Sequence, residues 1–328
     1  MTLPLEPRLS IGVQTIHRRT EPAEGPWLPT IAEMEALVRL VDDSGYDSLW
    51  VGDHIAFAVS ILDPLLQLAQ AAAVSRRLML GTNVYLLPLR HPVLVAKQVA
   101  SLDHLSEGRL IFGVGIGGEF PREYEACGVP LSERGPRLSE ALPLLRRLWS
   151  GTPVSHQGRF YPAFSDVAMQ PPARQPGGPP IWVGGRADAA LARAGWLADG
   201  WISYVVTPEI YRAALEKIAA AAQQAGREIE RFGTGHLLFA RLDDSYERAL
   251  DAASESLSRR YAMDFRRAAE RYAALGRPEQ IAQRIRDFHA AGARHIVLDL
   301  VGPYEERPAQ IEAFARSVMP LLSDLRGD

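Results

Sequence analysis

The chain has 328 residues, of which 47% are hydrophobic and 23% are charged, an ordinary composition for a globular protein. Its net charge of −3 provides no basic surface for nucleic acid, and no apolar run is long enough to span a membrane. Cys127 is the only cysteine, which excludes an internal disulfide and a cysteine-based metal cluster. No signal-peptide pattern is visible at the start, so we expect a cytoplasmic protein.

Short apolar runs alternate with helical segments along the whole chain. The helices are predicted to begin at capping residues or prolines, as at Thr30, Asp63-Pro64 and Thr207-Pro208. The strands have few polar positions, as expected for a parallel sheet that is buried on both faces. About eight strands are predicted in this way, over residues 9–14, 46–51, 78–84, 110–114, 180–184, 199–204, 234–242 and 295–300.

This alternation predicts the fold class. Strands and helices that alternate form a parallel sheet, and about eight such units in a chain of this length favour a closed (β/α)8 barrel, the TIM barrel, over an open sheet. Residues 151–179 interrupt the pattern with many glycines and prolines. We interpret them as an insertion after the fourth helix, with a role in function or subunit contact. No linker is evident, so we expect residues 1–328 to form one barrel domain.

The stretch from Gly108 to Glu119 ends its strand in an unusual density of glycines. It fits the dinucleotide pattern G-x-G-x-x-G, but the strand with a terminal acidic residue that a Rossmann fold requires does not follow. Two interpretations remain. The glycines either let a flat or anionic ligand approach the backbone, or they allow a strand and a helix to pack closely without any ligand.

In a barrel of this kind, functional sites lie at the carboxyl ends of the strands. Four polar or glycine-rich pieces are expected there: Asp53-His54, Asn83, residues 115–119 and residues 184–186. Asp53 and His54 form a candidate acid–base pair; the alternative is a helix-capping aspartate beside a solvated histidine. Gly184-Gly185 precedes a helix and suits a phosphate group; the alternative is a plain tight turn.

Metal chemistry is not indicated, because the scattered histidines form no metal-binding spacing. Aromatic side chains could instead contribute to a pocket or simply pack in the core. The candidates for this pocket are His17, Trp27, Phe57 and Trp201.

Several motifs occur in a fixed order over residues 46–54 (YDSLWVGDH), 80–84 (LGTNV), 100–109 (ASLDHLSEGR), 113–117 (GVGIG), 148–151 (LWSG), 158–161 (GRFY), 180–185 (PIWVGG) and 198–201 (ADGW). Together they resemble the bacterial luciferase-like family of flavin- and deazaflavin-dependent oxidoreductases. The resemblance covers residues 9–204 well and the last third in general pattern. It implies the same (β/α)8 barrel with an insertion after the fourth helix.

Within that family, an Asp-His pair after the second strand is typical of the branch that uses coenzyme F420. The resemblance implies that Asp53 contacts the deazaflavin and that His54 faces the substrate as an acid or base. Asn83-Val84 matches a bulge, often with a non-prolyl cis peptide, that supports the back of the ring. The remaining cofactor residues implied are Gly115, Ile116 and Gly117 at the ring edge and Val183, Gly184 and Gly185 at the phosphate end of the tail.

The chain also departs from the family pattern. The F420-dependent sugar-phosphate dehydrogenases place a glutamate directly after Gly-x-Gly, whereas Gly118 is inserted here and Glu119, a candidate catalytic acid, follows it. Their lysine-rich phosphate site is not found, and Tyr204 and Arg241 stand at the ends of the corresponding strands. Glucose 6-phosphate is therefore not the expected substrate.

These observations predict an F420-dependent oxidoreductase that transfers a hydride between a small organic substrate and C5 of the deazaflavin. The first alternative is an FMN-dependent monooxygenase on the same scaffold, which would activate O₂ at the flavin. The second is a barrel that binds flavin without catalysis. By the same resemblance we expect a homodimer.

Overall fold

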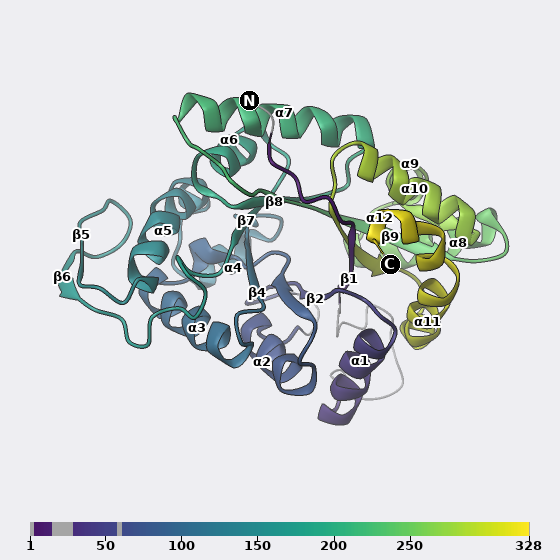
Figure 1. Ribbon diagram of the computed structural model, residues 1–328, viewed down its shortest axis with the longest axis horizontal. Helices are drawn as coiled ribbons and strands as arrows, with labels where there is room; N and C mark the ends of the chain where they lie inside the picture. Colours follow the sequence, from purple (N-terminus) through teal and green to yellow (C-terminus); the bar gives the residue numbers. More distant parts are fainter. Residues whose placement is uncertain (1–2, 15–28, 58–60, 328) are drawn as a thin grey trace.

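The structure is a computed structural model that describes residues 3–14, 29–57 and 61–327. Eight parallel strands form a closed barrel in the order β9-β11-β1-β2-β3-β4-β7-β8, and pairing of β8 with β9 closes the ring (Figure 1). The predicted (β/α)8 barrel is thereby confirmed. The strands are β1 (Ser10–Gln14), β2 (Ser48–Val51), β3 (Met79–Thr82), β4 (Leu110–Val114), β7 (Ile181–Gly184), β8 (Gly200–Tyr204), β9 (Gly233–Leu242) and β11 (His295–Leu300).

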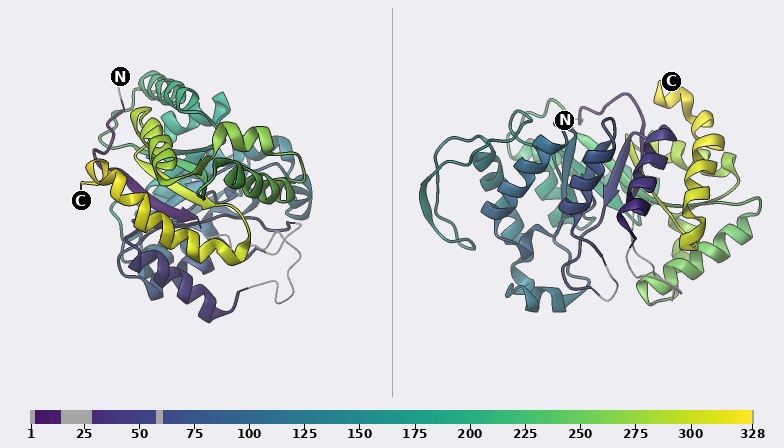
Figure 2. Two further views of the ribbon diagram at one scale, coloured as in Figure 1. Left: turned by 90° about the vertical axis from the view of Figure 1, so that its right-hand side faces the viewer. Right: turned by 90° about the horizontal axis from the view of Figure 1, so that it is seen from below.

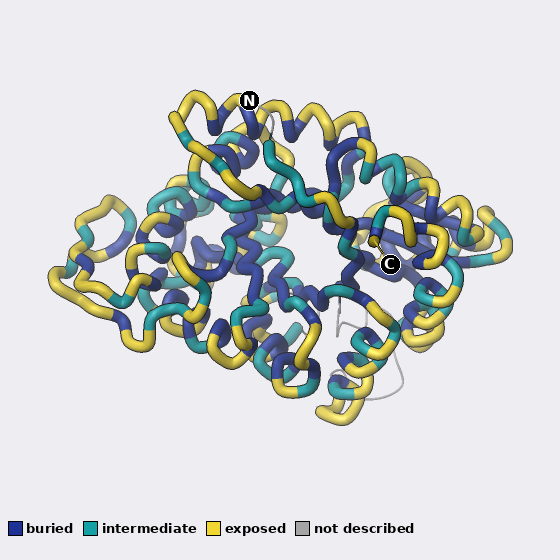
Figure 3. Tube along the Cα trace, viewed as in Figure 1, coloured by how far each residue is buried: buried dark blue, intermediate teal, exposed yellow. Residues whose placement is uncertain are grey.

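Helices connect successive strands and cover the outside of the barrel, and Figure 3 shows the buried segments gathered around the barrel. Several begin as predicted: the Thr30 side chain caps α1 with Glu33 in a capping box, and the Asp63 and Thr207 side chains accept backbone N–H bonds at the starts of α2 and α7. The main helices are α1 (Ile31–Asp43), α2 (Pro64–Val74), α3 (Pro92–Leu105), α5 (Arg134–Trp149), α6 (Asp188–Leu197), α7 (Pro208–Gln224), α10 (Pro278–Ala290) and α11 (Arg307–Ser317). Short helices are α4 (Pro121–Ala126) and α12 (Ser323–Arg326), with 3₁₀ turns at Leu87–Leu89, Leu131–Glu133, Tyr304–Glu306 and Met319–Leu322.

Two excursions extend this plan. Strands β5 (Val154–His156) and β6 (Phe164–Val167) pair as an antiparallel hairpin in the glycine- and proline-rich segment, to one side of the barrel (Figures 1 and 2). After β9 the chain forms α8 (Tyr246–Tyr261), α9 (Arg266–Tyr272) and β10 (Ala274–Gly276). The sequence pattern predicts two helical segments, over about residues 244–261 and 264–275, but β10 pairs with the end of β9, so tertiary pairing overrides the local helical preference at the end of the second segment.

Two tryptophans fill the lower part of the barrel. The rings of Trp50 on β2 and Trp182 on β7 lie 5.5 Å apart, and His295 meets both edge-on. Neighbouring strands make room for these rings with glycines, at which an added Cβ would lie within 3.0 Å of an indole atom. These are Gly12, Gly81, Gly200, Gly233 and Gly235. The described strands therefore enclose a filled interior below the carboxyl end of the barrel, which leaves that end open to a site.

Two buried histidines make the fold sensitive to acid. Burial lowers the pKa of His295, which hydrogen-bonds Ser48, to about 4 and that of His236 to about 3. Each ring stays neutral in the folded chain, whereas an unfolded histidine binds a proton near pH 6.5. The stability that each contributes is therefore lost as pH falls from about 6.5 toward the folded pKa.

We expect the free energy of unfolding to fall by about 2 kcal/mol per buried histidine between pH 7 and pH 5. Urea denaturation across this range measures the fall. The His295→Gln variant should be less stable at pH 7 but should show a shallower pH dependence than the unsubstituted chain. Carboxylates titrate in both proteins, so the difference between the two slopes isolates His295, and equal slopes would contradict its assignment.

Candidate active site

The predicted site residues do come together at the carboxyl end of the barrel. The loops that follow β2, β3, β4 and β7 contact one another there: Tyr85 forms a bridge with Val114, and the Val84 side chain reaches both Gly115 and Gly184. Tyr204 at the end of β8 shares its face of the strand with Ile202, which packs in the cluster around Trp182. Asp53-His54, Asn83-Val84, residues 115–119 and residues 184–186 thus surround one barrel mouth.

His54 has a buried carboxylate as its partner. Its Nδ1 lies 2.9 Å from Oε2 of Glu123 on α4, and the Glu123 side chain is 2% exposed. The other oxygen, Oε1, accepts the backbone N–H groups of Ile55 and Ala56 at 2.6 and 3.0 Å, which fixes the loop that carries the histidine. A carboxylate oxygen accepts hydrogen bonds, so Nδ1 donates to Glu123 and Nε2 is the ring nitrogen left for a ligand. Within residues 3–14, 29–57 and 61–327, Nε2 has no hydrogen-bond partner.

Packing also fixes the plane of the His54 ring. Phe57 stacks on it with a centroid separation of 3.9 Å and an interplanar angle of 12°, and Phe120 meets Phe57 edge-on at 5.6 Å. The imidazole is therefore held from one side by a carboxylate and from one face by a ring. This arrangement leaves Nε2 as its reactive atom.

Asp53 is held by protein groups on both of its oxygens. Arg90 Nη1 and Nη2 donate to Oδ2 and Oδ1 at 2.6 and 2.9 Å, and the Leu86 N–H donates to Oδ2 at 2.8 Å. The Asp53 side chain is fully buried. Burial raises the pKa of Asp53 and Arg90 opposes that change, while the pair raises the pKa of Arg90, so we interpret the pair as ionised. Asp53 therefore faces Arg90 and not open space, and it ties the loop after β2 to the loop after β3.

The peptide bond between Asn83 and Val84 is cis, as the family resemblance implied. The Asn83 Nδ2 donates to Oε1 of Gln14 at 2.8 Å, which joins the ends of β1 and β3. Val84 explains two of the predicted cofactor glycines. A Cβ at Gly115 or Gly184 would lie 2.4 or 2.6 Å from a Val84 methyl carbon.

The other glycines of the β4 turn have similar explanations. A Cβ at Gly113 would lie 1.9 Å from the Thr82 carbonyl oxygen, and one at Gly117, where φ is +51°, would lie 2.9 Å from a Leu86 methyl. Close packing within the protein therefore accounts for these glycines. The nearby Ile116 is partly exposed, and its carbonyl accepts a hydrogen bond from the Tyr124 hydroxyl.

Glu119, in the loop after β4, reaches the end of β8. Its Oε1 accepts a hydrogen bond from the Tyr204 hydroxyl at 2.7 Å. Burial, and then the adjacent Glu119, raise the pKa of Tyr204, so the phenol keeps its proton. The Arg186 guanidinium lies 5.4 Å from the centre of the Tyr204 ring and donates to the Val205 carbonyl at 3.0 Å.

The segment predicted to hold a phosphate leads into α6. Gly185 adopts a positive φ of +122°, its carbonyl accepts from the Trp201 indole at 2.7 Å, and no side chain caps α6 at Ala187. This leaves the first N–H groups of α6 without a side-chain cap, as an anion site requires. The Val183 side chain, in contrast, is fully buried in the core and offers no surface to a ligand.

The four side chains that were candidates for an aromatic pocket differ in where the structure places them. Trp201 is fully buried, so packing explains it, whereas Phe57 lies on His54. His17 and Trp27 fall outside the described residues. In the described part of the chain, no three His, Cys, Asp or Glu side chains form a potential metal site, and every helix is too short or too polar to cross a bilayer.

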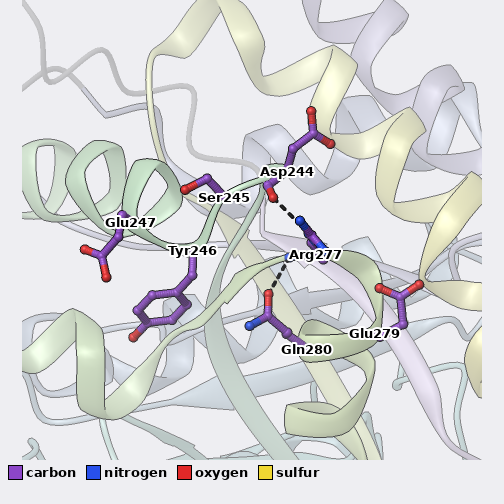
Figure 4. Close-up of a pocket in the computed structure, with 7 residues that line it drawn as sticks. All are labelled: Asp244, Ser245, Tyr246, Glu247, Arg277, Glu279 and Gln280. Carbon is purple, nitrogen blue, oxygen red and sulfur yellow. Dashed lines mark hydrogen bonds between the residues drawn. The ribbon is translucent and has the colours of Figure 1, made fainter.

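A surface hollow of about 510 Å³ lies elsewhere, near the starts of α8 and α10 (Figure 4). Its lining is Asp244, Ser245, Tyr246, Glu247, Arg277, Glu279 and Gln280, which includes none of the predicted site residues. There the Arg277 backbone N–H donates a hydrogen bond to Gln280 Oε1, and the Arg277 Nε donates to the Asp244 carbonyl. The hollow is open and charged, and the residues that could perform chemistry lie at the barrel mouth instead.

A (β/α)8 barrel with a histidine–carboxylate pair at its carboxyl end has the arrangement of an enzyme active site. The chain belongs to the luciferase-like monooxygenase family, whose model matches residues 10–295. An F420-dependent glucose-6-phosphate dehydrogenase from Nakamurella multipartita is 26% identical over 326 residues, covering 90% of this chain and 94% of the relative.

A flavin-dependent trigonelline monooxygenase component from Acinetobacter baylyi is 34% identical over 157 residues, 47% of this chain and 43% of the relative. Among solved structures, the monooxygenase RslO1 from Streptomyces bottropensis matches with a TM-score of 0.81 and 26% identity, covering 95% of this chain and 99% of that one. The family thus contains both F420-dependent oxidoreductases and flavin monooxygenases.

Proposed function

We propose that this protein is an F420-dependent oxidoreductase that acts on a small organic substrate at the barrel mouth. The Asp53-His54 pair and the similarity to an F420-dependent dehydrogenase over 90% of the chain support this choice of cofactor. When bound, a deazaflavin exchanges a hydride with a substrate carbon. The chain's own residues must then bind the substrate, exclude water and exchange the accompanying proton.

The single observation that carries the proposal is the His54–Glu123 pair. Glu123 holds the proton on Nδ1, which makes Nε2 the atom that accepts a proton from a substrate oxygen or, once protonated, returns it. Glu119 is a second candidate acid, and its hydrogen bond with Tyr204 places that pair beside the same mouth. Asp53 has a positioning role in this proposal. It accepts hydrogen bonds from Arg90 and Leu86 and so joins the loop that carries His54 to the segment after β3.

The residues at the mouth fit a planar cofactor at Gly52. This glycine has no positive φ, and a Cβ built on it would meet nothing closer than the Asn83 carbonyl oxygen at 3.7 Å and Gln14 Nε2 at 3.9 Å. Unlike Gly115 and Gly184, it has no neighbour in the described structure that requires the absence of a side chain. We propose that the ring lies over Gly52, Asn83 and Val84, and that the phosphate end of the tail binds at Gly184-Gly185 and the start of α6.

The alternative proposal is an FMN-dependent monooxygenase with the same barrel. The 34% identity to a flavin-dependent monooxygenase component and the close structural match to RslO1 favour it. The two cofactors have similar ring outlines, so the same backbone surface would receive either. The choice between them therefore depends on direct binding measurements.

The test is a fluorescence titration of the purified protein with F420 and, separately, with FMN. We expect tighter binding of F420, and binding of FMN alone would overturn the proposal. The Gly52→Ala variant should keep the stability of the parent chain in urea, because its methyl group has room in the protein. The same variant should bind the cofactor about tenfold or more weakly, because the methyl group takes space from the ring. Unchanged affinity for the cofactor would contradict the position of the ring over Gly52.

A further inference from the structure

An arginine without an ion-pair partner borders the glycine turn after β4. The Arg134 guanidinium, at the start of α5, lies against Gly118, where an added Cβ would be 3.0 Å from Nε and 3.5 Å from Cζ. Its Nη1 donates to the Leu131 carbonyl at 2.7 Å, which holds the group in place. The buried Nε has no hydrogen-bond partner, and Arg134 forms no ion pair with any residue of the described ranges. Because a charge removed from water is ordinarily paired, we expect its partner to come from outside the chain.

The turn itself carries a row of free donors. The backbone N–H groups of residues 116–120 have no acceptor within the part of the chain that the structure describes. Gly117 and Gly118 adopt positive φ values of +51° and +109° there. Successive N–H groups in a turn of this kind form a concave surface that binds anions. The guanidinium beside Gly118 adds a full positive charge to these donors.

No acidic side chain of this region compensates the charge. Glu119, Glu123 and Glu133 each accept a hydrogen bond from a different side chain, and none of these donors is Arg134. An anion that enters the turn would therefore find the guanidinium available.

The turn is also joined to the histidine of the active site. The Tyr124 hydroxyl donates to the Ile116 carbonyl, and the preceding residue of α4, Glu123, holds His54. Burial raises the pKa of Tyr124 to about 12, and the nearby Arg134 opposes that rise. Helix α4 therefore links the turn and its cation to the histidine, within one group of loops at the mouth.

We infer that the substrate carries a carboxylate, which binds between the Arg134 guanidinium and the backbone N–H groups of the turn after β4. One guanidinium matches a monoanion, whereas a phosphate monoester carries close to two charges near neutral pH. Both kinds of donor make charge-assisted hydrogen bonds to a carboxylate. The inference rests on the proposed function for the identity of the site. It assigns this turn to the substrate, because the turn adjoins α4 and His54, whereas we place the cofactor's phosphate end at Gly184-Gly185.

Binding without turnover tests the inference. The probes are phenylacetate, phenylacetamide and benzyl phosphate, whose rings suit Phe57 and Phe120 beside His54. Calorimetry on the cofactor-loaded protein should show phenylacetate binding about tenfold more tightly than the amide, which has the same shape without the charge. Benzyl phosphate should bind more weakly than phenylacetate. Equal affinity of acid and amide would overturn the inference, and tighter binding of the phosphate would overturn the monoanion class.

The Arg134→Met variant tests the assignment to this residue. It should reduce the preference for phenylacetate over phenylacetamide to less than about twofold and leave the affinity for the amide unchanged, because only the charged contact is lost. Arg134→Lys keeps the charge and should retain a preference of about threefold or more. Arg316→Met, at an exposed arginine in the last turn of α11, is the matched control and should keep the full preference.

The cofactor affinity of Arg134→Met separates substrate from cofactor. It should stay within about threefold of the parent value, and a loss of about tenfold would assign the guanidinium to the cofactor's phosphate and overturn the inference. If a variant fails to fold, the comparison of acid and amide on the unsubstituted chain still decides. Binding of FMN in place of F420 would contradict the proposed function alone, because the three probe affinities can be measured with either cofactor bound.

Discussion

Replacing His54 with Asn should lower kcat by about 10²- to 10⁴-fold, the usual contribution of a general acid–base group. The affinity for the cofactor should change by less than about threefold, because the substitution removes no contact that we assign to the ring. Asparagine is smaller than histidine, has no atom at the position of Nε2 and does not exchange protons near neutral pH, so the chemistry is lost and the fold is retained. Steady-state kinetics gives the first quantity and fluorescence titration gives the second.

Glu123→Gln sharpens this test. Its amide oxygen can still accept the N–H groups of Ile55 and Ala56, but its NH₂ group then faces Nδ1 of His54. The ring must move its proton to Nε2 and can no longer act as a base there. We expect a loss of kcat close to that of His54→Asn with the loop intact. His104→Asn, an exposed histidine of α3, is the control and should keep normal turnover. Full activity of either site variant would remove the pair from the mechanism.

The fold was predictable because its signals are local. Apolar runs mark strands that are buried on both faces, and capping residues such as Thr30 and Asp63 mark helix starts, so each element could be located from its own neighbourhood. The strand β10 was missed because its pairing with β9 is a long-range contact, and nothing in Ala274-Leu275-Gly276 itself indicates a strand. A helical pattern on both sides made helix the natural prediction.

The site was predictable only in part, for a related physical reason. The residues at strand ends follow from the barrel, but their partners do not. Glu123 lies 69 positions from His54, on a short helix whose sequence reads as an exposed surface turn. Arg90 lies 37 positions from Asp53 and precedes a helix start without any motif of its own.

The glycines show the same limit. A missing side chain can serve a ligand or a neighbouring atom of the protein, and sequence cannot distinguish the two. Gly115 and Gly184 make room for Val84, whereas Gly52, which was not among the predicted cofactor residues, has open space beside it. Only coordinates reveal which glycine lacks a reason within the protein, and that one is the better candidate for contact with a cofactor.

The second large effect concerns stability. Arg90→Met should lower the free energy of unfolding by about 3–5 kcal/mol, the usual cost of removing one partner from a buried ion pair. The guanidinium makes both of its short contacts to Asp53 and also lies 4.2 Å from the Tyr85 ring centre, so a methionine of similar length replaces the packing but not the charge. Urea denaturation measures the loss. The double variant Asp53→Asn/Arg90→Met should be more stable than Arg90→Met alone, because it leaves no buried charge.

The loss should also depend on pH, and its direction identifies the cause. Burial raises the pKa of Asp53, and Arg90 is the main group that opposes this. The folded-state pKa of Asp53 is already raised with Arg90 present, and without Arg90 it lies further above the unfolded value near 3.9, so the folded variant is favoured by protonation and loses stability as pH rises through that raised pKa. The stability difference between the parent chain and Arg90→Met should therefore be smaller at pH 5 than at pH 8. A difference independent of pH would mean that Arg90 acts through packing on Tyr85, and that the charge of Asp53 is solvated by other groups once the guanidinium is gone.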